Sequence, residues 1–139
     1  MAMEQTSLQN TTASDGSMSL HGRNVLVLED EPIILLNVSR ALQRGGATVR
    51  RARTVAKALV GLAEGGIDAA ILDVNMGQGE TCRAVAEGCR NRHIPFCLYS
   101  GDLAEAGELV SSLKAPLIQK PASDRTIVTG VAELFDVPG

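Results

Sequence analysis

The sequence predicts an α/β fold in which a five-stranded parallel sheet carries five helices on its two faces. Short apolar runs alternate five times with segments of helical periodicity. The apolar runs are continuous, as is typical of strands that are covered on both faces. Five strand–helix units joined by right-handed crossovers form a doubly wound sheet. With 139 residues, 45% of them hydrophobic, the chain is long enough for one such domain and too short for two.

Each predicted strand is an apolar run of about four residues. The strands are expected at 25–28, 47–50, 69–72, 96–99 and 116–119. The second contains fewer apolar residues than the others, so we place it at an edge of the sheet. Residues 1–23 are mostly polar and are expected to form a flexible tail, because they bury too little apolar area to offset the entropy of ordering. The folded domain is expected at 24–136.

The predicted helices follow the strands. The first begins at Pro32 and ends at Gly45-Gly46, which are typical start and stop residues. Thr54 is suited to cap the second helix. The inward side of that helix is expected to contain Val55, Ala58, Leu59 and Leu62. Three further helices are expected at about 81–92, 103–113 and 123–135.

Charge and hydropathy argue against two classes of function. The formal net charge is −3, whereas nucleic-acid-binding domains usually have a clustered basic excess. The one dense basic run, Arg50, Arg51 and Arg53, is interpreted as a solvated edge. No stretch reaches the ~18 apolar residues of a membrane helix, and no secretion signal is recognisable, so a cytoplasmic location is expected. The three cysteines fit neither a disulfide nor a common zinc pattern.

Polar side chains follow four of the five predicted strands. They are Glu29, Asp30 and Glu31 after the first strand, Asp73 after the third, Ser100 after the fourth and Lys120 after the fifth. The carboxyl ends of parallel strands form the ligand-binding edge of such a sheet, so these groups are expected to converge. Three carboxylates repel one another unless a cation lies between them, and oxygen ligands favour Mg²⁺. The sequence therefore predicts a magnesium site that also binds a phosphoryl group.

Asp73 is suited to covalent chemistry at this site. Its carboxylate can attack phosphorus and form an acyl phosphate. Ser100 and the backbone amides of Val74 and Gly101 can donate hydrogen bonds to phosphoryl oxygens, and Lys120 can balance the negative charge. Taken singly, Ser100 also fits a turn, Lys120 a solvated surface, and the acidic triplet the start of a helix.

Three segments resemble the receiver domains of bacterial two-component response regulators, and the resemblance covers about residues 24–136. Residues 25–32 (VLVLEDEP) resemble the family's first strand and acidic pair, residues 71–76 (ILDVNM) its phosphoacceptor segment, and residues 119–121 (QKP) its lysine–proline turn. The resemblance implies the strand order 2-1-3-4-5 and phosphorylation of Asp73. It implies that Asp30 and Asp73 bind Mg²⁺ directly, Glu29 through water and Asn75 through its backbone carbonyl. It also implies phosphoryl transfer from a phosphohistidine on a histidine kinase or phosphotransfer protein.

Three features depart from the family's usual pattern. Ser100 replaces the more frequent threonine but keeps the hydroxyl group. Leu117 occupies the position of the usual aromatic switch residue, so a rotating ring cannot report phosphorylation. Gly77 replaces a frequent proline, and the connection from Ser100 to Lys120 looks short for the fourth helix.

A domain without an attached output domain is expected to signal by docking, as a monomer or weak dimer. Ile33 and Leu36 of the first helix point away from its core side, near Arg40. We expect these residues to contact the kinase or phosphotransfer protein. Two incidental surface aliphatics are the alternative interpretation.

Three rival functions differ from the receiver in what they require. A phosphatase or phosphotransferase with an aspartyl nucleophile usually has a second acid two residues later. Asn75 occupies that position, so we do not expect an enzyme. The main alternative is a docking module that regulates a kinase or other partner without phosphorylation, which Leu117 favours. A nucleotide-binding protein is disfavoured because no glycine-rich phosphate-binding motif follows a predicted strand.

Overall fold

The structure is a computed structural model that describes residues 19–136, so residues 1–18 of the predicted tail and residues 137–139 lie outside it. Five strands form one parallel sheet in the order β2-β1-β3-β4-β5. They are β1 (Asn24–Leu28), β2 (Thr48–Ala52), β3 (Ala69–Asp73), β4 (Phe96–Ser100) and β5 (Leu117–Gln119). The predicted fold and strand order are confirmed, and β2 lies at an edge as its thin apolar content indicated.

Five α-helices connect and follow these strands. They are α2 (Pro32–Arg44), α3 (Val55–Glu64), α4 (Arg83–Asn91), α5 (Leu103–Leu113) and α6 (Asp124–Ala132), and the 3-10 helix η2 (Glu133–Asp136) follows α6. The connection from Ser100 to Lys120 accommodates α5 at a length of 11 residues. Within residues 19–136, no helix combines the length and the apolar character needed to cross a bilayer.

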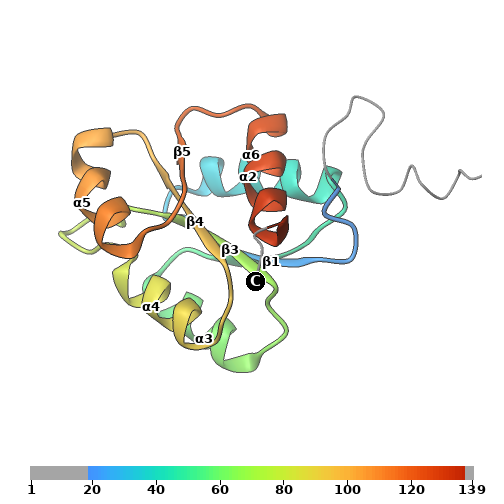
Figure 1. Ribbon diagram of the computed structural model, residues 1–139, viewed down its shortest axis with the longest axis horizontal. Coiled ribbons are helices and arrows are strands. Elements are labelled where there is room, and N and C mark those ends of the chain that lie inside the picture. Colours follow the sequence, from blue (N-terminus) through green and yellow to red (C-terminus); the bar gives the residue numbers. More distant parts are fainter. Residues whose placement is uncertain (1–18, 137–139) are drawn as a thin grey trace, which may run out of the picture.

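The sheet lies between two layers of helices (Figure 1). On one face, Val27 and Ile71 pack against α2 and α6, and on the other, Leu26 and Leu72 pack against α3, α4 and α5. Successive residues of a strand point to opposite faces, so each central strand contributes to both cores. This explains why the apolar runs of the central strands are continuous.

Local sequence signals account for the ends of the helices. Pro32 lies in the first turn of α2, where its missing N–H is not needed. Gly46 follows α2 with a φ of 103°, and a Cβ at this position would lie 2.8 Å from the Cα of His21. Both the backbone angle and the close approach therefore require glycine. Thr54 caps α3, because its hydroxyl oxygen accepts the N–H of Lys57 at 3.0 Å.

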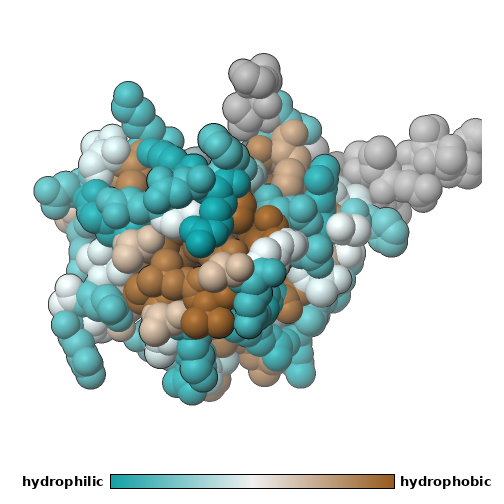
Figure 2. Space-filling model, turned by 90° about the horizontal axis from the view of Figure 1, so that it is seen from below, coloured by the Kyte–Doolittle hydropathy of each residue, from teal (hydrophilic) through white to brown (hydrophobic). Residues whose placement is uncertain are grey.

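The predicted inward side of α3 is correct except at Leu59. Val55, Ala58 and Leu62 are buried, whereas Leu59 is 36% exposed. A helix turns about 100° per residue, which puts Leu59 at the border of the buried side. Val60, on the outer side of the same helix, is 53% exposed. Figure 2 shows an apolar surface on the side of the molecule where α3 and α4 lie.

The packed part of the described chain begins before residue 24. Leu20, which we assigned to the tail, is fully buried in the core between the sheet and the α2–α6 layer. Its N–H donates to the carbonyl oxygen of Gly45 at 2.8 Å. The Arg23 guanidinium lies 4.0 Å from the centre of the Phe135 ring. A single leucine among polar residues shows no periodicity, so its burial left no signal in the sequence.

Candidate functional site

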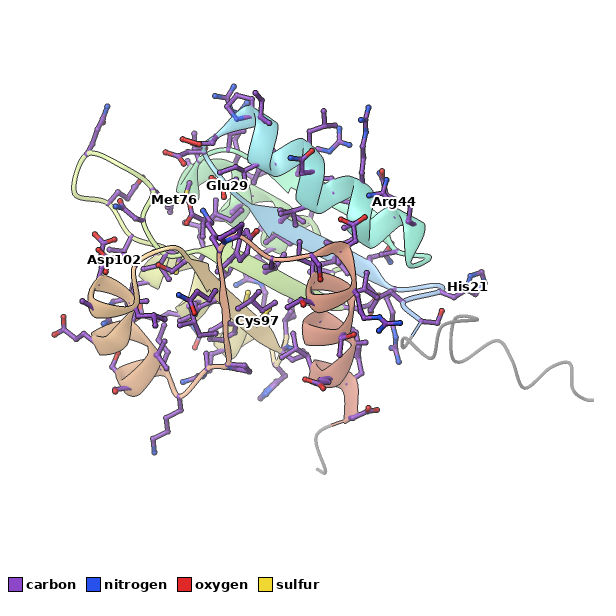
Figure 3. The ribbon with its side chains drawn as sticks, turned by 90° about the horizontal axis from the view of Figure 1, so that it is seen from above. His21, Glu29, Arg44, Met76, Cys97 and Asp102 are labelled. Atoms are coloured by element: carbon purple, nitrogen blue, oxygen red, sulfur yellow. The ribbon has the colours of Figure 1, made fainter. Side chains whose placement is uncertain are left out.

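The strand ends bring the predicted polar residues together at one edge of the sheet. Figure 3 shows Glu29, Met76 and Asp102 at this edge, and His21 at the opposite end of the sheet. Glu29, Met76 and Asp102 belong to the segments that follow β1, β3 and β4, respectively. An open cleft lies at this edge. Its lining includes the acids Glu29, Asp30 and Asp73, together with Asn75, Ser100 and Lys120.

Three carboxylates meet in the cleft. One ligand oxygen from each of Glu29, Asp30 and Asp73 lies within 4.8 Å of the other two. Glu29 and Asp73 are buried, and Asp30 is half-buried. Gly77 lies beside them, and a Cβ at this position would make an ordinary contact with Asp30 Oδ2 at 3.4 Å. Close carboxylate oxygens beside a small residue fit a small divalent cation such as Mg²⁺.

Lys120 faces these acids from the end of β5. Its Nζ donates to Glu29 Oε1 at 3.0 Å and to Asp73 Oδ1 at 3.1 Å. The same Nζ lies 4.9 Å from the centre of the Tyr99 ring. The Lys120–Pro121 peptide bond is cis. The ammonium group thus contacts two of the three clustered carboxylates directly.

Burial and neighbouring charges change the protonation of these groups. Burial raises the pKa of Glu29 to about 7, against the opposing effects of the Glu31 N–H and Lys120. Burial also raises the pKa of Asp73, again with Lys120 opposing the rise. Burial alone lowers the pKa of Lys120, but its contacts with Glu29 and Asp73 outweigh burial and leave that pKa raised. The ionised carboxylates are therefore costly, and a bound cation would stabilise them.

The side chain of Asn75 connects the loop after β3 to α5. Its Oδ1 accepts the N–H of Gly77 at 2.9 Å, and its Nδ2 donates to Glu105 Oε2 at 3.2 Å and Oε1 at 3.3 Å. Glu105 was not among the predicted site residues. Helical periodicity does not tell which loop faces the first turn of α5, so this contact was not predictable from the sequence.

Ser100 is buried at the end of β4. Its Oγ accepts the N–H of Asp102 at 3.1 Å and donates to the carbonyl oxygen of Asp102 at 3.2 Å. Gly101 follows it in the lining of the cleft, and a Cβ at this position would lie 3.7 Å from the Cβ of Lys120. Ser100 and Gly101 are thus both in the cleft, with the hydroxyl group engaged by the turn into α5.

The backbone amide of Val74, a predicted donor to the phosphoryl group, has a partner in the sheet. Its N–H donates to the carbonyl oxygen of Tyr99 at 3.1 Å. The parallel ladder between β3 and β4 therefore continues one residue beyond Asp73. This amide is therefore engaged within the sheet, and its donation to a phosphoryl oxygen stays a prediction.

The basic run near β2 is exposed at the edge of the sheet, as predicted, and two of its arginines also make specific contacts. Arg53 Nη2 donates to the carbonyl oxygen of Asp30 at 3.2 Å, and Arg50 pairs with Glu64 at 2.6 Å. Arg53 therefore supports the loop that carries two of the clustered acids. Contacts from a side chain to a distant backbone carbonyl leave no recognisable sequence pattern.

The residues expected to dock a partner are exposed on α2, which begins directly after the acidic loop. Ile33 is 74% exposed and Leu36 is 36% exposed, and Arg40 is also exposed. Their exposure agrees with the side of the helix that the sequence assigned to them.

All three cysteines are buried free thiols. Cys82 and Cys89 lie in the core that α3, α4 and α5 cover, and Cys97 lies in the core that α2 and α6 cover. Burial raises the pKa of each thiol to about 12.

Comparisons with protein-family models and with curated proteins find no match. Solved structures do match. SdrG from Sphingomonas melonis Fr1 is 35% identical, with a TM-score of 0.71 over 85% of this chain and 99% of that one. A response regulator receiver protein from Sinorhizobium medicae WSM419 is 27% identical, with a TM-score of 0.74 over 85% and 98%. The response regulator protein TrrA from Thermotoga maritima, solved in complex with Mg²⁺–BeF, is 26% identical, with a TM-score of 0.63 over 70% and 86%.

Proposed function

Because this chain belongs to the family of response regulator receiver domains, we propose that it accepts a phosphoryl group on Asp73 and passes the signal on by docking to a partner protein. Membership in the family implies two-component signalling with a kinase or phosphotransfer protein. The observation that carries the proposal is the position of Asp73. Its carboxylate is buried beside two further carboxylates and accepts a hydrogen bond from Lys120 at 3.1 Å.

Mg²⁺ is the proposed cofactor. Asp30 and Asp73 would hold it directly, Glu29 through water and Asn75 through its backbone carbonyl. These roles are supported by the cluster of carboxylate oxygens that lie within 4.8 Å of one another, since oxygen ligands of this kind suit a hard cation. The ion would supply positive charge that offsets repulsion between these carboxylates and the incoming phosphoryl group.

The proposed step is a displacement at phosphorus. A carboxylate oxygen of Asp73 forms a bond to the phosphorus of a partner's phosphohistidine, the P–N bond breaks, and its electron pair stays on the imidazole nitrogen. Asp73 must be ionised for this step, and Lys120 favours the ionised form. The resulting acyl phosphate makes the domain a stoichiometric acceptor of a phosphoryl group, so we do not propose an enzyme.

Three donors would then stabilise the phosphoryl oxygens. Lys120 already lies beside Asp73, and Gly101, whose N–H would be the second donor, lines the cleft. The hydroxyl of Ser100 would exchange its bond to the Asp102 carbonyl for a bond to a phosphoryl oxygen. Fixed donors aimed at the transferred group, together with neutralised charge, are the main requirements of phosphoryl transfer.

Incubation with Mg²⁺ and acetyl phosphate, followed by intact-mass measurement, tests the phosphoacceptor. Wild type should gain the mass of one phosphoryl group, and Asp73→Asn should gain none. The matched control is Asp68→Asn at the other end of β3, where Asp68 Oδ2 accepts the N–H of Asn24 at 2.7 Å. This control should be phosphorylated like wild type. Phosphorylation that persists in Asp73→Asn would overturn the assignment.

The same experiment separates the proposal from docking without phosphorylation. Leu117 on β5, in place of an aromatic switch residue, is the observation that favours this alternative. A folded wild-type protein that gains no phosphoryl group from acetyl phosphate or from a phosphorylated kinase would support the docking module.

We propose that the exposed face of α2, with Ile33, Leu36 and Arg40, docks the kinase or phosphotransfer protein. Leu36→Asp should slow transfer from a phosphorylated partner that phosphorylates wild type, while transfer from acetyl phosphate stays unchanged. Val60→Asp on α3 is the control, because it adds the same charge at another exposed apolar position. Equal rates for wild type and Leu36→Asp would show that this face does not dock the partner.

A further inference from the structure

Glu105 lies in the wall of the cleft, and no role has been assigned to it so far. Both of its carboxylate oxygens accept from the side-chain amide of Asn75, at 3.2 and 3.3 Å. A hydrogen bond to an ionised acceptor is stronger and more directional than one between neutral groups. Glu105 therefore restrains the residue whose backbone carbonyl is the proposed fourth contact of Mg²⁺.

The contacts around Asn75 leave it little freedom. Its Oδ1 accepts the N–H of Gly77 at 2.9 Å, and its backbone forms an isolated antiparallel bridge with Thr81. These contacts lie within the loop between β3 and α4. Its side-chain contact with Glu105 is different, because it ties the loop to another element, the first turn of α5.

Glu105 is itself held in place by the start of α5. Its N–H donates to Asp102 Oδ1 at 3.1 Å, and the N–H of Asp102 donates to Ser100 Oγ at 3.1 Å. A continuous series of hydrogen bonds thus runs from the end of β4 to the loop after β3. A carboxylate fixed in this way can orient its partner, as outer contacts of metal sites commonly do.

We propose that Glu105 is a positioning residue for Mg²⁺. It strengthens Mg²⁺ binding by holding Asn75 so that the backbone carbonyl of Asn75 is directed into the cleft. The inference rests on the proposed function, because it takes that carbonyl as a magnesium ligand. Glu105 also adds negative charge to the cleft, which would attract a cation without any positioning. The experiment therefore has to separate position from charge.

Titration calorimetry with MgCl₂ on three variants makes this separation. Glu105→Ala removes both the contact and the charge, and should weaken Mg²⁺ binding about tenfold, the lower end of what outer-contact losses cost metal sites. Glu105→Gln removes the charge but keeps an oxygen that accepts from Asn75, so it should lose clearly less. Glu108→Ala removes an exposed carboxylate one turn further along α5 and should bind like wild type.

A double-mutant cycle with Asn75→Ala tests whether Glu105 acts through Asn75. Asn75→Ala keeps the backbone carbonyl and loses the side-chain contacts. Glu105→Ala should cause no further loss of Mg²⁺ affinity in that background. An undiminished loss there, or an equal loss in Glu105→Gln and Glu105→Ala, would mean that Glu105 acts by charge alone and would overturn the inference.

Hydrogen exchange in the metal-free protein gives a readout that does not depend on Mg²⁺. The Gly77 amide is bonded to Asn75 Oδ1, so its exchange should be faster in Glu105→Ala than in wild type and Glu108→Ala. If Glu105→Ala binds Mg²⁺ as tightly as wild type does, this inference is overturned while the proposed metal site stands. Wild type that binds no Mg²⁺ would overturn the proposed metal site and this inference with it.

Discussion

At the residue scale, the neighbours of Asp73 have opposite effects on its charge. Burial and the charge of Asp30 raise its pKa, whereas Lys120 lowers it. The net rise means that ionised Asp73 destabilises the folded protein once the pH exceeds the ordinary aspartate value. The form that would attack phosphorus is therefore the less stable form when no metal is bound. Functional sites often reduce stability in this way.

This balance predicts a gain in stability when the charge of Asp73 is removed. In EDTA, Asp73→Asn should raise the free energy of unfolding, because it removes a charge whose ionised form burial disfavours. Added Mg²⁺ should stabilise wild type and leave Asp73→Asn almost unchanged. Urea denaturation at pH 7.5 with and without Mg²⁺ measures both effects. A lower stability of Asp73→Asn in EDTA would show that Lys120 outweighs burial.

Residues at strand ends were the predictable part of the site. Glu29, Asp73 and Lys120 each follow an apolar run, and the topology of a parallel sheet then determines that they meet. Glu105 and Arg53 were missed, because their contacts depend on how a helix turn or a long side chain lies against a distant loop. Such placement is a product of packing and has no period in the sequence.

At the scale of elements, apolar content determined how well boundaries could be predicted. The central strands β1, β3 and β4 match their predicted bounds to within one residue at every end, since continuous apolar runs define them. The second strand was predicted at 47–50 and lies at Thr48–Ala52. It is an edge strand with one buried residue, Ala52, so the pattern there is weak. The periodicity of α3 likewise predicted its buried side but not that Leu59 lies at its border.

The two sides of α3 should respond differently to truncation. Leu62→Ala removes a buried side chain and should cost about 2–5 kcal/mol of unfolding free energy. Val60→Ala on the exposed side should stay within about 0.5 kcal/mol of wild type. Chemical denaturation of both variants gives the comparison. Similar losses would mean that Val60 is covered in solution.

At the scale of the whole molecule, the three buried thiols report on both cores of the sheet. Burial raises their pKa from 9.0 to about 12. A thiol with a raised pKa contributes stability that is complete below pH 9 and is lost as the pH rises through 9 towards 12. At pH 8 the folded thiols should therefore be both inaccessible and protonated, and poorly nucleophilic for either reason.

Thiol labelling with a chromogenic disulfide reagent at pH 8 should thus follow opening of the fold. Native protein should react slowly at all three cysteines, and all three should react at once in guanidinium chloride. Cys82 and Cys97 lie on opposite faces of the sheet, so equal native rates would indicate one cooperative unit. Rapid labelling of Cys97 alone would indicate that the α2–α6 layer opens separately.

The side chains of Arg23 and Phe135, near the entry and the exit of the folded unit, are in contact, with the Arg23 guanidinium 4.0 Å from the centre of the Phe135 ring. They meet away from the acidic edge, near the end of the sheet where Figure 3 shows His21. Ends that lie near each other suit insertion of this unit into a loop of another protein, because the two sides of that loop need not move apart. An excised version should begin no later than Ser19, so that Leu20 keeps its place, and the cleft would then face outward from the graft.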